Sequence, residues 1–96
     1  MSYPPPNAPA PGGRTAPLQW QDGGRAHIDV RGLPAPQPLV AILRLVRALP
    51  EGTSAVVVHH DRDPMLLYPE LAELGWGATR IEGDPGEVRL LLEVLS

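Results

Sequence analysis

The sequence has 96 residues and a formal net charge of −3, with eight basic side chains against eleven carboxylates. A chain of this length allows one domain, and its hydrophobic content of 43% is ordinary for a globular protein. The negative charge argues against a nucleic-acid-binding surface, because neutralising phosphates requires clustered basic side chains. The basic residues are all arginine and are scattered along the chain, which excludes a polybasic strip for a membrane surface as well.

Cysteine is absent from the sequence, which removes disulfides, thiolate nucleophiles and thiolate metal ligands. The sequence also contains no apolar run near the ~18 residues that a membrane-spanning helix needs, and no charged-then-apolar leader. We therefore expect a cytoplasmic protein that does not bind a membrane.

Residues 1–24 differ in composition from the rest of the chain. Six of the thirteen prolines lie within residues 1–17, and such a stretch buries too little apolar surface to offset its ordering entropy. We expect a disordered tail here, in which Trp20 is the one side chain able to dock on the domain. The domain itself is expected over residues 25–96. At about 70 residues it would be marginally stable, and formation of a homodimer would help it.

A strand and a helix are the first predicted elements of the domain. The alternation over Ala26–Val30 is typical of a strand, and Gly32 can supply the positive φ of a turn after it. From Leu39 the apolar residues recur with the spacing of one helical face. Either Pro36 or Pro38 suits the first turn of this helix, because the amide hydrogens missing there would have no intrahelical partner. The predicted apolar face consists of Leu39, Ile42, Leu43, Val46 and Leu49.

The next predicted pair is a buried strand and a second helix. Ser54–His60 is an apolar, β-branched run, which predicts a central strand buried on both faces. Asp63 and Pro64 then form a helix-start signal, as N-cap and first helical residue. Because Pro69 would cost about 3 kcal/mol inside a regular helix, we expect an irregular turn over Pro64–Tyr68 and regular helix from about Pro69.

Two further strands complete the prediction. They cover residues 76–82 and 87–95 and are joined by the turn sequence Gly-Asp-Pro-Gly. The order of elements is therefore β-α-β-α-β-β. This order predicts an α/β fold of the α+β two-layer sandwich type, with two helices on one face of a four-stranded mixed sheet.

The segment of residues 29–38 resembles the signature of the TusA/SirA-like sulfur-carrier superfamily, Asp-x-x-Gly-Leu-x-Cys-Pro-x-Pro, which leads into the first helix. Ala35 stands at the position of the sulfur-carrying cysteine. A second segment, residues 60–76 (HDRDPMLLYPELAELGW), is similar to a bacterial branch of that superfamily whose domain has no known function, in which a His/Asp-Asp-Pro-x-x-Leu-Tyr segment opens the second helix. The resemblance covers roughly residues 26–95 and implies a TusA/SirA-like fold. The matching positions of the first motif are Asp29, Gly32, Leu33, Pro36 and Pro38.

The resemblance also bears on chemistry. A cysteine just before a helix has its thiolate stabilised by the helix dipole, whereas Ala35 cannot ionise or carry sulfur, so sulfurtransferase activity is excluded. Binding of a small anion at the same helix start is an alternative that Arg31 favours. Pro36 and Pro38 weigh against it because they remove two amide donors, and a rigid turn with a helix cap is the preferred interpretation. Members of the similar branch often occur near hemerythrin-like domains, in respiratory or nitrogen-oxide settings.

The densest group of metal-ligand types is formed by His59, His60, Asp61 and Asp63. Adjacent strand residues point to opposite faces, so the two histidines cannot easily share one ion. His60, Asp61 and Asp63, with His27 from the neighbouring strand, are therefore weak metal candidates. The competing interpretation places one histidine at the core edge and the aspartates at the start of the second helix. We expect no cofactor.

Tyr68 and Trp76 are large amphipathic side chains of the kind favoured at interfaces, although packing over the sheet edge explains them equally well. No catalytic constellation is evident, and we expect no enzymatic activity. The leading hypothesis is a protein-binding or regulatory module with an unidentified protein partner. The alternative is a metal- or small-anion-binding domain that serves a redox or nitrogen-oxide-related partner. The candidate binding residues are Arg31, Gly32, Gln37, His60, Asp61, Asp63, Tyr68 and Trp76.

Overall fold

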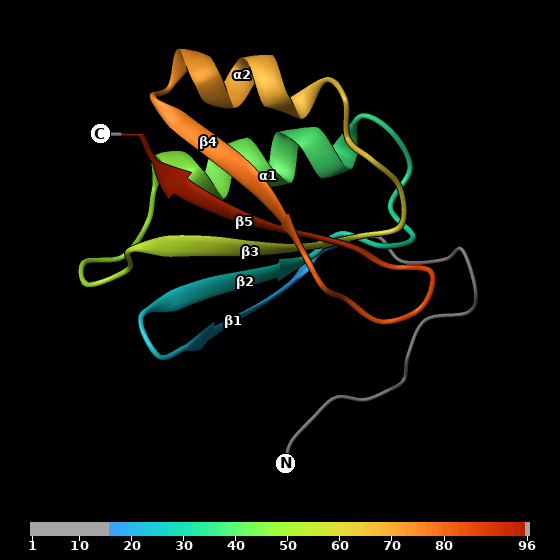
Figure 1. Cartoon of the computed structure of the whole chain (residues 1–96), viewed down its shortest axis with the longest axis horizontal. Coiled ribbons are helices and arrows are strands. Elements are labelled where there is room, and N and C mark those ends of the chain that lie inside the picture. The colour runs from blue at the N-terminus through green and yellow to red at the C-terminus, as the bar shows by residue number, and fades with distance from the viewer. Residues whose placement is uncertain (1–15, 96) are drawn as a thin grey trace.

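The computed structural model of the chain describes residues 16–95. Two helices lie side by side over one face of a mixed β-sheet, and the other face of the sheet carries no helix (Figure 1). The predicted α+β two-layer class is therefore confirmed, with five strands in place of four. The strands are β1 (Leu18–Asp22), β2 (Arg25–Asp29), β3 (Ala55–His60), β4 (Trp76–Ile81) and β5 (Val88–Val94), and the helices are α1 (Gln37–Arg47) and α2 (Leu67–Glu73).

The additional strand, β1, lies in the segment that was expected to be part of a tail. It pairs antiparallel with β2, and the two strands are joined by Gly23 and Gly24, both with positive φ. Such a two-residue glycine connection matches the twist of a hairpin. All five residues of β1 are exposed, and its apolar alternation is confined to Leu18 and Trp20, which is too short to identify a strand beside a proline-rich segment. The part of the expected tail at residues 1–15 lies outside the described residues.

The sheet has the order β1-β2-β3-β5-β4, in which only the β2–β3 pair is parallel. All six residues of β3 are buried, as predicted for a central strand. Because successive side chains of a strand alternate between faces, Val56 and Val58 belong to the core beneath the helices, whereas His59 points away from them. The core is completed by Ile28, Val30, Leu90 and Leu92 from the sheet and by Ile42, Val46, Leu67 and Leu71 from the helices.

Helix α1 begins where the proline motif predicts. Pro36 is its N-cap and Pro38 lies within the first two helical positions, where the missing amide hydrogen breaks no helical bond. Gly32 has a φ of +83°, as expected of the preceding turn, and the Ala35–Pro36 peptide bond is cis. The predicted apolar face of the helix is directed into the core.

Helix α2 begins after the predicted start signal at Asp63 and Pro64. It begins slightly before Pro69, where regular helix was expected. Its first residue is Leu67 and its N-cap is Leu66, with no side-chain cap. Asp63 as N-cap is therefore wrong, although an irregular turn does precede the helix. Pro69 falls in the first turn, where its missing amide hydrogen has no intrahelical partner. Neither helix within residues 16–95 is long and apolar enough to cross a lipid bilayer.

Candidate functional site

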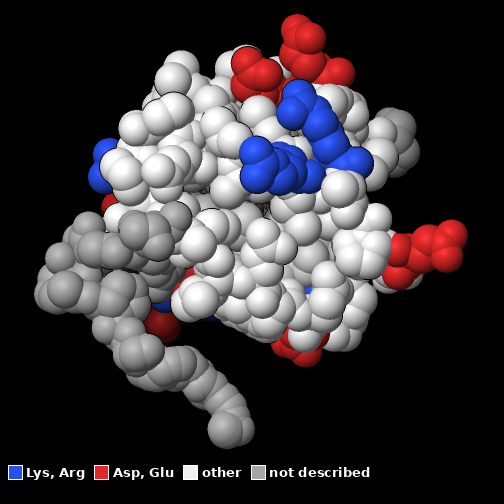
Figure 2. All heavy atoms as spheres, turned by 180° about the vertical axis from the view of Figure 1, so that it is seen from behind, with Lys and Arg blue, Asp and Glu red and all other residues white. Residues whose placement is uncertain are grey.

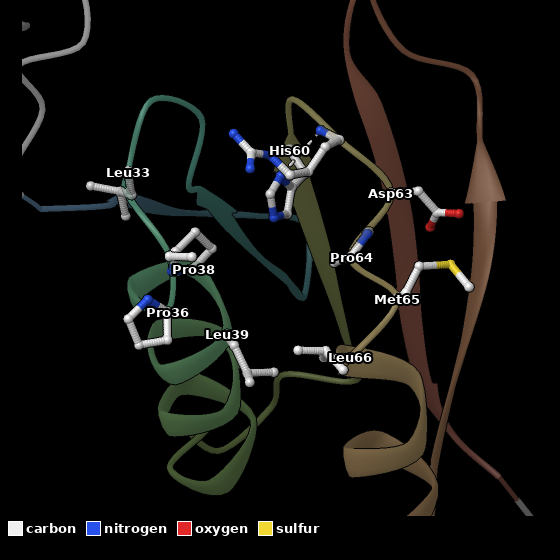
Figure 3. A pocket seen from close by; sticks show the side chains of 11 residues that line it. Leu33, Pro36, Pro38, Leu39, His60, Asp63, Pro64, Met65 and Leu66 are labelled. Atoms are coloured by element: carbon white, nitrogen blue, oxygen red, sulfur yellow. Dashed lines mark hydrogen bonds between the residues drawn. The ribbon is translucent and has the colours of Figure 1, made fainter.

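A hollow of about 230 Å³ lies between the beginnings of α1 and α2 (Figure 3). One wall comes from the turn before α1 and the other from the loop that joins β3 to α2. Ala35, at the position of the carrier cysteine in the motif, lines its rim. We call this site the interhelix hollow. Its apolar lining is formed by Leu33, Ala35, Pro36, Pro38, Leu39, Pro64, Met65 and Leu66, and its polar lining by His60, Arg62 and Asp63.

His60 forms the floor of the interhelix hollow. The residue is 3% exposed, and its Nδ1 accepts the backbone N–H groups of Asp61 at 2.9 Å and Arg62 at 3.3 Å. Burial lowers the pKa of His60 below its usual value, more than the neighbouring Asp61 raises it. The ring is therefore neutral near pH 7, and because Nδ1 accepts, the ring proton is on Nε2, at the end of the ring that points into the hollow in Figure 3.

Asp61 holds the two walls of the hollow together. Its Oδ2 accepts the backbone N–H of Gly32 at 3.1 Å, and its Oδ1 accepts the Arg62 Nε–H at 3.3 Å. Burial by itself would raise the pKa of Asp61, but the hydrogen bond from Gly32 and the contacts of His60 and Arg62 lower it overall. The two motif segments thus meet through a charged hydrogen bond.

Arg31 does not contribute to the hollow. Its Nε and Nη2 donate to the two carboxylate oxygens of Asp29 at 2.9 and 2.7 Å, and its backbone N–H donates to the same side chain at 3.0 Å. The carboxylate raises the pKa of Arg31 and holds its guanidinium through Nε and Nη2, and Arg31 is not among the residues that line the hollow. The support that Arg31 was expected to give to an anion at the helix start is therefore weakened.

The other predicted binding residues divide between the hollow and more distant places. The Tyr68 hydroxyl donates to Asp63, and burial together with this carboxylate raises the pKa of Tyr68 to about 12. The pair braces the loop before α2. Gln37 lines a separate shallow depression on the far side of Pro36. Trp76 pairs with Val94 at the opposite end of the sheet and packs on the core, so it belongs to no surface shared with the hollow.

The metal candidates do not converge. His60 faces the helices, while His27 lies on the helix-free face of the sheet, where it contacts His59. Within residues 16–95 no three histidine or carboxylate side chains lie close enough to hold a metal ion. Asp61 and Asp63 are instead engaged by Gly32 and Tyr68.

The helix-free face of the sheet carries a cluster that the sequence did not reveal. Rings of Trp20, His27 and His59 stack with centroids 5.0 to 5.3 Å apart. Nδ1 of His27 lies 3.0 Å from Nε2 of His59, and Nδ1 of His59 lies 2.6 Å from Oε2 of Glu87. The adjacency of the two histidines follows from the β2–β3 pairing, whereas Trp20 joins them only because β1 exists.

Glu87 is the anchor of this cluster. Its carboxylate accepts the Nε–H and Nη2–H of Arg89 at 2.9 and 2.8 Å and the backbone N–H of Asp84 at 3.0 Å. The Arg89 guanidinium is the main cause that lowers the pKa of Glu87 to about 2. The ionised carboxylate of Glu87 accepts a hydrogen bond from Nδ1–H of His59. In the tautomer that carries its proton on Nδ1, Nε2 of His59 can accept from Nδ1–H of His27. This is a hydrogen-bonded chain from a buried carboxylate to a half-buried imidazole.

These features define a small α+β domain with one apolar hollow at its paired helix starts and a polar cluster on the other face of its sheet. The chain belongs to a family of uncharacterised conserved proteins, DUF2249, whose model matches residues 27–94. Strand β1, which supplies Trp20, precedes the matched span. Comparison with curated proteins gives no match to the chain.

Proposed function

We propose that the protein is a non-enzymatic interaction module that binds a partner protein at the interhelix hollow. The observation that carries the proposal is the exposure of Met65 and Leu66, which are 66% and 75% accessible at the edge of this apolar site. Side chains of this size gain stability when they are removed from water. Clustered around a concave apolar surface, they mark a place for another molecule.

The charges near the hollow indicate the chemistry of the partner. The side chain of Arg62 lines the hollow and is 68% exposed. From Leu39 a shallow depression continues along α1 to Arg44 and Arg47. Figure 2, which views the molecule from behind, shows one group of arginine side chains with acidic side chains directly beside it, and a further basic patch at the left edge. A segment with a bulky apolar side chain next to acidic residues complements this surface, because opposite charges steer association and fix orientation.

The likeness to TusA/SirA-like carriers is part of this proposal. The position that carries sulfur in that motif is Ala35, which lines the hollow. A carrier that hands over sulfur must dock with other proteins at the same place. We propose that the docking site is kept in this chain and that the chemistry is lost with the thiol. The alternative of a metal- or anion-binding domain has weaker support, because Arg31 is paired with Asp29.

The test is selection of binding peptides from a random displayed library with the full chain as bait. We expect the selected peptides to combine a bulky apolar residue with neighbouring acidic residues, and their amide NMR shifts to map onto the hollow. The substitution Leu66→Glu should weaken the binding at least about tenfold, because a carboxylate would then be placed at an apolar contact.

The matched control is Leu18→Glu, since Leu18 is 54% exposed and lies on the helix-free face of the sheet, opposite Asp29. This control should bind the peptides as the unmodified protein does. Equal binding by both variants, or shifts that map away from the hollow, would contradict the proposal.

A further inference from the structure

We infer that the interhelix hollow recognises a tyrosine side chain of the partner, whose phenol oxygen accepts a hydrogen bond from Nε2 of His60. The inference rests on the proposed function and names the residue that enters the hollow. It is carried by the hydrogen-bonding state of His60 and by the shape and polarity of the walls around it.

The floor of the hollow offers one donor. Both backbone N–H groups that reach His60, those of Asp61 and Arg62, are directed at Nδ1. Asp61 Oδ1 also lies 3.1 Å from Nδ1, but two N–H groups already directed at this nitrogen leave no room for a proton on it. The proton of the neutral ring is therefore on Nε2, and within residues 16–95 no hydrogen-bond partner of Nε2 is present. A ligand that fills the hollow without an acceptor would cut this N–H off from water, and a buried donor without a partner is costly. The occupant must therefore bring an acceptor to the floor.

The acceptor should be uncharged. The walls that enclose His60 are apolar, and the ring itself is neutral. A carboxylate placed there would give up its hydration in exchange for a single neutral donor, which does not compensate for the loss of water. The side chain of Arg62 is 68% exposed, so a carboxylate that pairs with it belongs at the solvent-exposed rim and not at the buried floor. A neutral oxygen fits this floor better.

The rest of the occupant should be flat and apolar. A hollow of about 230 Å³ is below the usual range of about 300–1,000 Å³ for small-molecule pockets, and it suits one large side chain. The rings of Pro36, Pro38 and Pro64 form much of the wall. Tyrosine has an apolar aromatic body with an oxygen at its tip. Phenylalanine would leave the Nε2–H unpaired, and the indole N–H of tryptophan would meet it with a second donor.

The first test compares two peptides that differ only at the anchor, tyrosine in one and phenylalanine in the other, in a sequence selected on the full chain. The tyrosine peptide should bind about tenfold more tightly, because the phenylalanine peptide leaves the buried Nε2–H without a partner. On binding, the NMR signal of the His60 Nε2–H should move with the tyrosine peptide and not with the phenylalanine peptide.

The second test uses His60→Asn. The asparagine Oδ1 stands where the histidine Nδ1 stood and can still accept the N–H groups of Asp61 and Arg62, but nothing replaces the Nε2 donor. The variant should lose the preference for tyrosine, so that it binds the tyrosine and phenylalanine peptides with equal affinity. If the variant does not fold, the peptide pair and the His60 signal of the unmodified protein decide the question.

The outcomes separate the inference from the proposed function. Peptides that bind in the hollow with equal affinity for tyrosine and phenylalanine, and with a stationary Nε2–H signal, would overturn the inference and leave the interaction module in place. Failure of every peptide to shift the amides that line the hollow would overturn both.

Discussion

Glu87 concentrates more interactions than any other single side chain described above. Its carboxylate is 1% exposed and is bound to Arg89, His59 and the backbone of Asp84. Taking this carboxylate out of water is costly, and the charged hydrogen bonds compensate for that cost only while it is ionised. The stability of the domain should therefore depend on pH through this residue.

The first prediction concerns acid unfolding. The pKa of Glu87 falls from 4.5 to about 2 on folding, which corresponds to about 3 kcal/mol of stability. Because the folded-state pKa is the lower one, this contribution is complete above pH 4.5 and is lost as the pH falls from 4.5 toward 2. Urea unfolding at a series of pH values measures it. In Glu87→Gln the free energy of unfolding should be lower at pH 7, and its difference from the unmodified protein should shrink in this window.

Two histidines also make the domain less stable as the pH falls, but in a higher range of pH than Glu87 does. Burial is the main cause that lowers the pKa of both His27 and His60 from 6.5, so folding favours their neutral forms. Their contribution is complete above pH 6.5 and declines as the pH falls below it. This part of the profile should persist in Glu87→Gln. Glu70→Gln, at an exposed position of α2, is the control for the general effect of removing one negative charge, and a profile like that of Glu87→Gln would contradict the assignment.

At the scale of elements, β1 is the strand with the least support from the core. Every residue in it is exposed, and it is held by its pairing with β2 and by the stacking of Trp20 on His27 and His59. Edge strands with so few buried contacts open more readily than central strands. The ring stack is therefore the main side-chain contact that keeps this strand on the sheet.

The second prediction follows from this stack. Trp20→Ala should accelerate amide hydrogen exchange across β1 while that of β3 stays close to its original rate, and it should lower the free energy of unfolding by about 1–2 kcal/mol. Trp20→Phe keeps an aromatic ring over the imidazoles and should recover most of the protection. Equal exchange in all three proteins would show that backbone pairing alone holds the strand.

Sequence patterns predicted the elements whose buried apolar residues recur over a whole helix or strand, and missed β1, in which only Leu18 and Trp20 alternate with polar residues. The central strand and the face of α1 could be located because their buried residues recur at fixed spacing. Strand β1 could not, since its stability comes from its pairing and from the rings of Trp20 and its neighbours. The start of α2 shifted because Asp63 bonds to Tyr68 and not to the helix backbone.

The location of the candidate site could be predicted in part, because two recognisable motifs form it. The turn at Gly32 and the loop after His60 were both recognised as motifs, and the Gly32–Asp61 bond brings them together. Which side chains face the hollow depends on strand direction and register, which no motif contains. Arg31 is therefore directed to Asp29, and Trp76 lies at the other end of the sheet.

At the scale of the whole molecule, the interhelix hollow and the polar cluster lie on different faces of the sheet. The interhelix hollow lies at the end where β3 stops at His60, while the end of the sheet near Gly77 and Glu93 is remote from it. Binding at the hollow should therefore protect one end of the domain and leave the other end accessible.

The third prediction uses the absence of cysteine, which allows a single thiol to report on each end. In Ala35→Cys the thiol would lie at the rim of the hollow, and in Glu93→Cys it would lie exposed on β5. A bound peptide should slow modification of the first thiol by a maleimide severalfold, because modification requires access to the thiol, and should leave the second rate unchanged. Equal slowing at both positions would place the peptide elsewhere or indicate a general loss of access.

The first described residues of the chain lie close to the interhelix hollow, and this offers a way to detect a partner that binds there weakly. Ala16 and Pro17 line a depression together with Leu33 and Pro36, two residues that also line the interhelix hollow. At the other end, Leu95 bonds to Gly75, beside the start of β4. A peptide joined directly before Ala16, in place of residues 1–15, would thus be tethered on the side of the hollow, where a linker of suitable length gives it an effective concentration near the millimolar range. Such a single-chain fusion would register an association too weak to measure between separate molecules, and the same peptide fused after Leu95 would need a much longer linker.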